Sequence, residues 1–282
     1  MANNVLITGL PRAGTTLVVS LLNHLDDVVA LHEPIEFMGA PLDGAKIYDA
    51  TIAPFIASTR DELLATRRAR TRVIDGEHDD NPYGDVRNDD GLRTSRARLG
   101  WTRIDKPLSP DFLLAVKHPM VFTAVLDRLV GRLPVYAVVR NPLALLASWA
   151  SVKSGFNRGH IPIAESLNIE IRERLANVDD VIGRQLAILD WMFSQYSRHL
   201  PRENIIAYED LVHSRGRALR VVTGRAEALD AELESRNDNR LYDRSIMLKA
   251  ADRLLSAPGA MWDYYSRADV QVLAEQVADH AP

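Results

Sequence analysis

Cysteine is absent from all 282 residues of the chain. Disulfide bonds, thiol catalysis and cysteine-ligated metal sites are therefore excluded. Long apolar runs are also missing, since no stretch approaches the ~20 apolar residues that a membrane-spanning helix needs. Neither sign of charge dominates, because 34 Lys and Arg stand against 38 Asp and Glu, a net charge of −4. This balance argues against general nucleic-acid binding, which usually requires a basic face.

The N-terminal residues MANNVLITG enter a strand-like run at once, without the basic flank and apolar core of a signal peptide. We therefore expect a cytoplasmic protein. The apolar fraction of 46% and the charged fraction of 26% are those of an ordinary globular protein, and a chain of this length can bury a substantial core.

Short apolar runs alternate with helical patterns along the chain. The strand-like runs are VLITGL, DVVAL, FLLAVK, PVYAVVR and NIIAY, at 5–10, 27–31, 112–117, 134–140 and 204–208. Most are apolar throughout, as in parallel strands covered on both faces. Helical periodicity follows at 15–25, 120–130, 143–152 and 181–199, the last stopped by Pro201. This alternation predicts an α/β fold, with a P-loop-type parallel sheet flanked by helices on both faces in one domain spanning 1–282.

Two segments depart from this alternation. Residues 67–110 are polar and turn-rich, which predicts a long insertion that is either a solvated loop or a lid over a site. Its arginines could meet an acidic glycan or lipid, but interspersed aspartates favour a solvated mixed-charge surface; they are Arg93, Arg96, Arg98 and Arg103. Residues 224–245 are charged and are expected to be helical and mostly exposed.

The segment GLPRAGTT at residues 9–16 leads from the first apolar run into a helical pattern. Gly9 and Gly14 bracket four residues, as in a Walker A loop, but Thr15 stands where the Walker lysine would be. Because that lysine contacts the β- and γ-phosphates, its absence argues against triphosphate chemistry.

The same loop offers donors to a different anion. The amides of Ala13, Gly14, Thr15 and Thr16 are expected to point at it from the helix N-terminus, where the helix dipole favours negative charge. Arg12 adds a fork-shaped cation. A strand–helix turn without a ligand is the alternative interpretation.

Polar side chains follow the other expected strands as well. These groups are His32–Glu33 (HEP), Lys117–His118 (KHP), Arg140–Asn141 (RNP) and Tyr208–Glu209–Asp210 (YED). The carboxyl ends of parallel strands form one edge of a sheet, which is where open α/β folds bind ligands. We therefore expect these groups to share a site.

The segment RNPLALLASW is the most informative of these. Asn141 can cap a helix that begins at Pro142. Ser148 then lies six residues along the helix, roughly 9 Å at 1.5 Å per residue. Arg140 and Ser148 could bind one phosphate from two sides. The alternatives are that Arg140 forms a surface ion pair and that Ser148 is a small residue in helix packing.

At these residues the chain resembles the sulfotransferases that use 3'-phosphoadenosine 5'-phosphosulfate (PAPS). PRAGTT is similar to their 5'-phosphosulfate loop, and VVRNPLALLASW to their 3'-phosphate segment. NIIAYEDLV resembles the strand that Tyr-Glu-Asp follows in many members, which implies a cofactor-binding role for Tyr208. PGAMWDYYSRADVQVLAEQ resembles their C-terminal Gly–Trp segment, but lacks the basic residues often found before that glycine.

The resemblance implies transfer of a sulfuryl group from PAPS to an acceptor hydroxyl, with 3',5'-ADP as product and no metal required. The acceptor would be a small molecule, a glycan or a lipid. Arg12, with Lys117 as a second cation, would stabilise the leaving group, unless Lys117 is a solvent-exposed strand-end residue. The base would be Glu33 or His118, since related enzymes use either type. Glu33 is favoured. The enzymes that use a histidine have it in a Lys-Thr-His context, whereas His118 follows Lys117 directly. His118 is therefore one residue out of register with that histidine, and the alternation of side chains along a strand would turn it away from the acceptor.

Two other functions stay open. A small-molecule kinase with a degenerate loop would need a magnesium-binding acid such as Asp210, as well as a lysine that this loop lacks. A non-catalytic nucleotide-binding protein would not need the base that Glu33 or His118 supplies.

Overall fold

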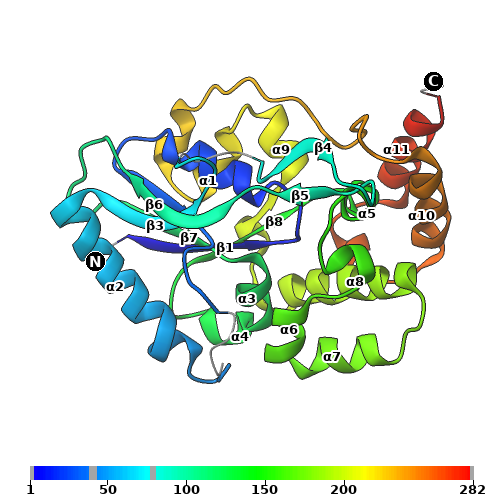
Figure 1. Ribbon diagram of the computed structural model, residues 1–282, viewed down its shortest axis with the longest axis horizontal. Helices are drawn as coiled ribbons and strands as arrows, with labels where there is room; N and C mark the ends of the chain where they lie inside the picture. The colour runs from blue at the N-terminus through cyan, green and yellow to red at the C-terminus, as the bar shows by residue number, and fades with distance from the viewer. Residues whose placement is uncertain (1–2, 38–42, 77–80, 280–282) are drawn as a thin grey trace.

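The structure is a computed structural model, which describes residues 3–37, 43–76 and 81–279 (Figure 1). It is an α/β protein built around a five-stranded parallel sheet. The strands of the sheet are β1 (Asn4–Gly9), β2 (Val28–His32), β7 (Leu113–Lys117), β8 (Val135–Val139) and β9 (Ile205–Ala207). Their order is β2-β7-β1-β8-β9. All five expected strands are confirmed, and β1 lies at the centre.

Helices follow the strands. They are α1 (Thr15–Asn23), α2 (Ala53–Thr66), α3 (Pro119–Ala124), α4 (Leu126–Leu129), α5 (Pro142–Ala150), α6 (Pro162–Leu167), α7 (Ile169–Ala176), α8 (Val181–His199), α9 (Tyr208–His213), α10 (Arg244–Ser256) and α11 (Arg267–Asp279). Shorter turns are η1 (Tyr48–Ile52), η2 (Phe156–Arg158), η3 (Arg202–Asn204), η4 (Arg217–Val221), η5 (Gly224–Ala228) and η6 (Ala260–Asp263). The helices expected at 15–25, 120–130, 143–152 and 181–199 are confirmed, although the one at 120–130 is divided at Val125 into α3 and α4.

The sheet is enclosed by these helices. Figure 1 shows α1 on one side of the sheet, and α3 and α8 on the other. The strands are almost wholly buried, and the apolar side chains form one connected core that extends from Val5 to Leu273. Among the described residues, no helix is both long and apolar enough to cross a membrane.

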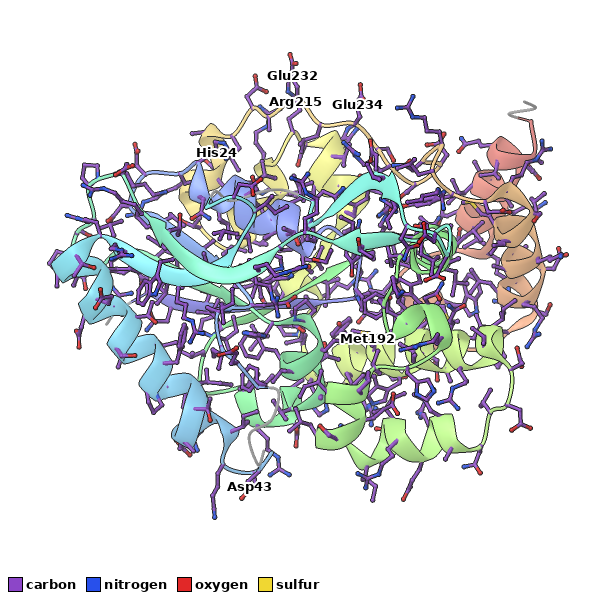
Figure 2. All side chains as sticks on the ribbon, in the orientation of Figure 1. His24, Asp43, Met192, Arg215, Glu232 and Glu234 are labelled. Atoms are coloured by element: carbon purple, nitrogen blue, oxygen red, sulfur yellow. The ribbon has the colours of Figure 1, made fainter. Side chains whose placement is uncertain are left out.

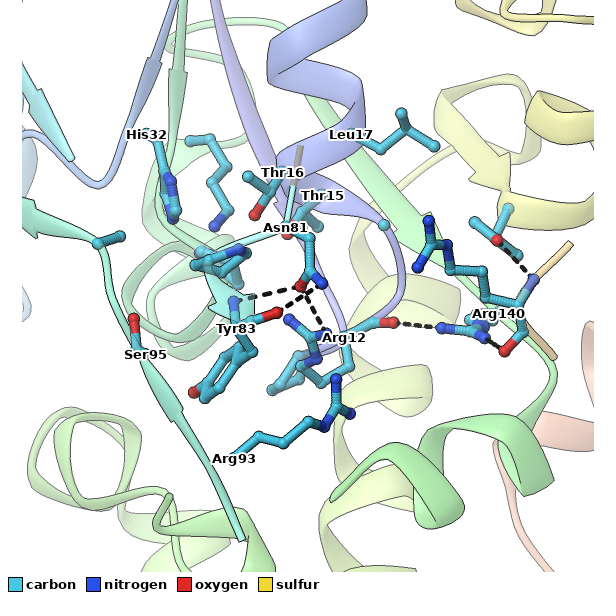
Figure 3. A pocket seen from close by; sticks show the side chains of 18 of the residues that line it. Arg12, Thr15, Thr16, Leu17, His32, Asn81, Tyr83, Arg93, Ser95 and Arg140 are labelled. Carbon is cyan, nitrogen blue, oxygen red and sulfur yellow. Dashed lines mark hydrogen bonds between the residues drawn. The ribbon is translucent and has the colours of Figure 1, made fainter. Parts of the chain in front are cut away.

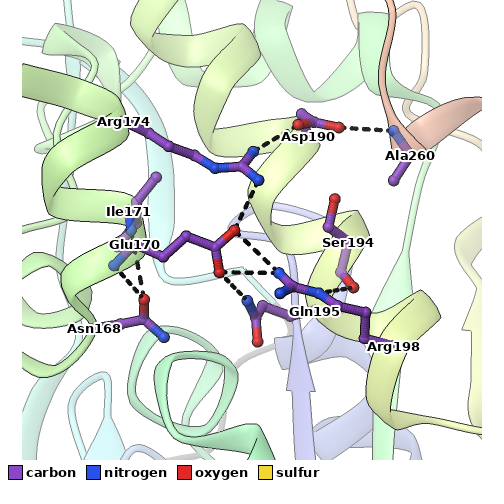
Figure 4. A network of polar contacts seen from close by, with 9 residues as sticks. All are labelled: Asn168, Glu170, Ile171, Arg174, Asp190, Ser194, Gln195, Arg198 and Ala260. Atoms are coloured by element: carbon purple, nitrogen blue, oxygen red, sulfur yellow. Dashed lines mark hydrogen bonds and ion pairs between the residues drawn. The ribbon is translucent and has the colours of Figure 1, made fainter. Parts of the chain in front are cut away.

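Helices α7 and α8 are joined by a polar network at the edge of this core (Figure 4). Arg174 binds Glu170 and Asp190, with N–O distances of 2.7 Å to each. Asp190 also accepts a hydrogen bond from the amide of Ala260, so the network includes η6. These contacts fix the C-terminal segment against α8.

The insertion at 67–110 is not the unstructured loop that its composition suggested. It contains two antiparallel pairs, β3 (Arg68–Val73) with β6 (Arg98–Arg103) and β4 (Tyr83–Arg87) with β5 (Arg93–Ser95). Thr71 accepts a hydrogen bond from the His32 amide at the end of β2. Because β3 docks on the main sheet in this way, tertiary contacts impose strand structure on a polar sequence.

The expected helix over 224–245 is also wrong for most of its length. Only η5 forms there, and residues 229–243 run without a helix or strand to α10. The hydroxyl of Tyr208 binds the carbonyl of Glu234 and the amide of Arg236, which replaces helical pairing of the backbone. The side chains of Glu232 and Glu234 point outward from this segment (Figure 2).

Candidate functional site

A cavity of about 410 Å³ lies at the carboxyl edge of the sheet (Figure 3). The loop before α1 and the ends of β2 and β7 form its floor. The insertion contributes residues from Arg72 to Ala97, and the segment 232–242 closes a further side. The predicted groups that line this cavity are Arg12, Gly14, Thr15, Thr16, His32, Glu33, Lys117, Arg140 and Tyr208.

The two glycines of the loop occupy positions that other residues would strain. Gly9 has φ +148, and a Cβ there would lie 2.5 Å from the carbonyl oxygen of Val138. Gly14 has φ +92, and its Cβ would lie 2.9 Å from Cδ2 of Tyr208. Gly14 caps α1 without any side-chain hydrogen bond. The first amides of α1 therefore face the cavity without a capping side chain.

Neighbouring residues hold the loop in place. The indole of Trp149 donates to the carbonyl of Pro11, at 2.8 Å. Arg140 donates to the carbonyl of Arg12, at 2.9 Å. The amide of Ala13 binds the carbonyl of Leu10, at 3.0 Å. Ala13 is thus buried and engaged within the loop, so the expectation that its amide points at the anion is wrong.

Arg12 extends from this loop toward α5 and the insertion. Its Nε atom donates to the Ser148 hydroxyl at 3.3 Å, and another nitrogen donates to the Asn81 side chain at 3.0 Å. The guanidinium lies 4.6 Å from the ring centre of Tyr83. Burial lowers the pKa of Arg12 to about 10, which leaves it charged at neutral pH.

Glu33 and Lys117 form an ion pair between the ends of β2 and β7. Lys117 Nζ lies 2.9 Å from Glu33 Oε1, and Arg72 Nε lies 3.2 Å from Oε2. Burial opposes ionisation of Glu33, but Lys117 and His32 hold its pKa well below the usual range. The Lys117 side chain is buried, which contradicts the solvent-exposed alternative. Burial lowers its pKa even though Glu33 opposes this shift.

His118 points away from the cavity. Its ring packs edge-on against Phe37 and Phe122, and Nε2 accepts a hydrogen bond from the amide of Ile35. Burial lowers its pKa to about 3, so the ring is neutral. Lys117 and His118 therefore lie on opposite faces of the backbone, as the alternation argument predicts, and only Lys117 lines the cavity.

Arg140 lines the cavity, whereas Ser148 is not among its lining residues. Arg140 donates to the Asn237 side chain at 2.8 Å and to the carbonyl of Arg236, and stacks 4.5 Å from the ring centre of Tyr208. Ser148 is fully buried and reaches the site through its bond to Arg12. Both predicted residues are thus brought near one another, with Arg140 also bracing the chain around it.

The helix cap in this segment is confirmed. The Asn141 side chain accepts a hydrogen bond from the Leu143 amide at 3.0 Å, and Pro142 is the first residue of α5. Glu209 accepts the amide hydrogen of Asn141, at 3.0 Å, so the YED segment supports the end of β8. Asp210 is exposed and does not line the cavity.

Several cavity residues escaped the sequence interpretation. Arg72, Asn81 and Tyr83 come from an insertion whose strands were not expected, and Tyr242 comes from a segment that was expected to be a surface helix. Arg93 was grouped with three other insertion arginines as surface. Those three are exposed, but Arg93 is buried against the cavity. The sequence gives only a weak indication of these cavity residues, which is the presence of aromatic residues inside charged runs.

No protein-family model matches the chain, and no curated protein matches its sequence at a significant level. The chemistry of the cavity is therefore the basis for choosing among the candidate functions.

Proposed function

We propose that the protein is a PAPS-dependent sulfotransferase that transfers a sulfuryl group to an acceptor hydroxyl and releases 3',5'-ADP. The observation that carries this proposal is that one cavity contains both an uncapped helix N-terminus and the Glu33–Lys117 pair. The helix N-terminus suits the phosphosulfate anion. The pair supplies a carboxylate for the acceptor proton and a cation for the leaving group. The sheet would then be of the P-loop type.

The chemistry requires two bonds and one proton to change. The acceptor oxygen forms a bond to sulfur while the bond from sulfur to the bridging phosphate oxygen breaks. Glu33, whose lowered pKa keeps it an ionised carboxylate, takes the acceptor proton. Negative charge grows on the departing phosphate, where Arg12, Lys117 and the first amides of α1 would stabilise it.

The residues of the cavity fit the donor chemically. The Tyr208 ring fills the space beside Gly14 and leaves no room for a Cβ, so only glycine fits at the start of α1. Arg140 and Ser148 lie beyond Arg12, where a second phosphate on the ribose would need its own contacts. A nucleotide with phosphates at both the 5' and the 3' position would use both groups of contacts.

The two other functions receive less support. A kinase would need an acid near the phosphates, but Asp210 is exposed outside the cavity. A non-catalytic binding protein would gain little from placing the buried Lys117 beside Glu33, since desolvating two charges costs free energy.

Calorimetry with the isolated protein tests the proposal. We expect 3',5'-ADP to bind at least about tenfold more tightly than either 5'-AMP or magnesium-free ATP, because a charge-assisted phosphate contact contributes roughly 1.5–3 kcal/mol. Tighter binding of ATP with magnesium would support a kinase, and no nucleotide binding would support a scaffold. Sulfate transfer from labelled PAPS to a panel of hydroxyl acceptors then tests catalysis.

A further inference from the structure

Arg93 is a buried cation that the proposed mechanism does not use. Only 2% of the residue is exposed, although it belongs to the insertion. One guanidinium nitrogen donates to the Ser151 hydroxyl at 2.7 Å. Its Nε atom is buried and has no hydrogen-bond partner among the described residues. An unpaired buried donor of this kind is costly unless a ligand satisfies it.

The surroundings of Arg93 are cationic. Its guanidinium points toward that of Arg12 (Figure 3), and Arg140 also lies near Arg12. In the described part of the chain, these three arginines donate hydrogen bonds to hydroxyl, amide and carbonyl oxygens and to no carboxylate. Like charges placed together out of water repel one another. A bound anion would remove that repulsion.

The backbone fixes Arg93 firmly in this position. The Arg93 amide binds the carbonyl of Ser151 at 3.0 Å, and the Arg93 carbonyl accepts from the amide of Lys153 at 2.8 Å. The insertion is thereby attached to the end of α5, the helix that carries Ser148. Ser151 directly follows α5, and its hydroxyl donates a hydrogen bond to the carbonyl of Ser148 at 2.7 Å.

A hydroxyl from a third segment completes this group. Tyr242 lies 3.5 Å from a guanidinium nitrogen of Arg140. Burial alone would raise the pKa of the Tyr242 hydroxyl, but Arg140, Arg12 and a hydrogen bond with Ser148 lower it. The spot between Ser148 and the three arginines therefore favours negative charge.

We propose that Arg93 joins Arg140 in a second anion subsite beside Ser148, which takes the 3'-phosphate of the nucleotide, while Arg12 serves the departing 5'-phosphate. This inference rests on the proposed function, and it makes the insertion part of the nucleotide site and not only of the acceptor site. Arg72, another cavity arginine of the insertion, is paired with Glu33 and is not part of this subsite. Arg93 thus contacts the 3'-phosphate, which 3',5'-ADP has and 5'-AMP lacks.

The test compares nucleotide binding by the wild type and by Arg93→Gln in calorimetry. We expect Arg93→Gln to lose about tenfold or more in affinity for 3',5'-ADP, and to change by less than about twofold for 5'-AMP. Arg103→Gln is the matched control, since Arg103 is an exposed arginine of the same insertion. It should leave both affinities unchanged.

A second variant separates ligand binding from folding. Arg93→Lys keeps the charge but loses the planar fork, so its affinity for 3',5'-ADP should fall between those of the wild type and Arg93→Gln. The melting temperature of Arg93→Gln without ligand should not fall, because the change removes a repelling charge.

Other outcomes of these measurements would overturn the inference. Equal losses for both nucleotides, or a lowered melting temperature with no nucleotide selectivity, would show that Arg93 serves the fold and would overturn the inference. Unchanged 3',5'-ADP affinity with a raised KM for the acceptor would place Arg93 at the acceptor and overturn it too. A wild type that does not prefer 3',5'-ADP would refute the proposed function itself, and this inference with it.

Discussion

Glu33 is held in a conformation that costs free energy. Its φ of +44 lies in the left-handed region, where a residue with a Cβ is strained. Its amide binds the carbonyl of Lys117 at 2.8 Å, and its carboxylate binds the Lys117 ammonium. Strained backbone of this kind is often retained at functional sites, where the surrounding contacts over-determine the geometry.

Glu33→Gln should therefore reduce turnover sharply. We expect a loss of roughly 10²–10⁴ in kcat under saturating PAPS, because Gln cannot accept the acceptor proton. Affinity for 3',5'-ADP should stay within about threefold, since the proposed role of Glu33 is at the acceptor. Steady-state rates with labelled PAPS and calorimetry provide the two measurements.

His118→Asn is the matched comparison for this prediction. His118 packs between two phenylalanines and accepts the Ile35 amide, so the change should cost about 1–3 kcal/mol of stability with little effect on kcat. If His118→Asn abolished turnover while Glu33→Gln retained it, the base would be His118.

At the scale of elements, the loop at residues 9–16 depends on glycine for two separate reasons. A left-handed backbone makes any other residue costly, and the ring of Tyr208 leaves no space for a Cβ at Gly14. Gly131 separates these effects, because it has a similar φ of +84 and no atom within 4 Å of its Cβ position.

Gly14→Ala and Gly131→Ala should therefore differ in a defined way. Both should lose about 1–2 kcal/mol of unfolding free energy from backbone strain. Only Gly14→Ala should also lose about tenfold or more in affinity for 3',5'-ADP, since the loop must shift away from Tyr208. Urea unfolding and calorimetry measure both effects. Equal nucleotide affinities for the two variants would contradict a role for this loop in anion binding.

The regular elements were predictable from the sequence to different degrees. The apolar strands and the Asn141 cap were read correctly, because burial on both faces and capping leave strong local patterns. The strands of the insertion and the extended run at 229–243 were not predicted from the sequence. Their structure comes from distant groups such as Thr71 and the Tyr208 hydroxyl, which no local pattern reports.

At the scale of the whole molecule, the cavity is assembled from segments far apart in the sequence. The strand-end residues Glu33 and Lys117 could be predicted, because parallel strands bring their carboxyl ends to one edge. Arg93 and Tyr242 could not, since they reach the cavity from the insertion and from the C-terminal third. The positions of Arg93 and Tyr242 depend on the path that the insertion and the run at 232–242 take across the carboxyl edge of the sheet.

Both crossing segments should respond when a nucleotide binds. The run at 232–242 lies outside helices and strands, and its ties to the cavity include the bonds made by Tyr208 and Arg140. The insertion strands β4 and β5 expose much of their surface and contain few paired residues. Segments with so few buried contacts open at low free-energy cost.

Hydrogen exchange followed by mass spectrometry measures this response. We expect amides in 81–95 and 232–242 to exchange more slowly when 3',5'-ADP is bound, because the phosphates bridge Arg93, Arg140 and the loop before α1. Helix α7 is the internal control, since it lies outside the cavity and is held by Glu170 and Arg174. Its exchange should not change. If 81–95 and 232–242 exchanged slowly without ligand and showed no further slowing with it, these segments would be fixed walls of the cavity, and the lid interpretation of the insertion would be wrong.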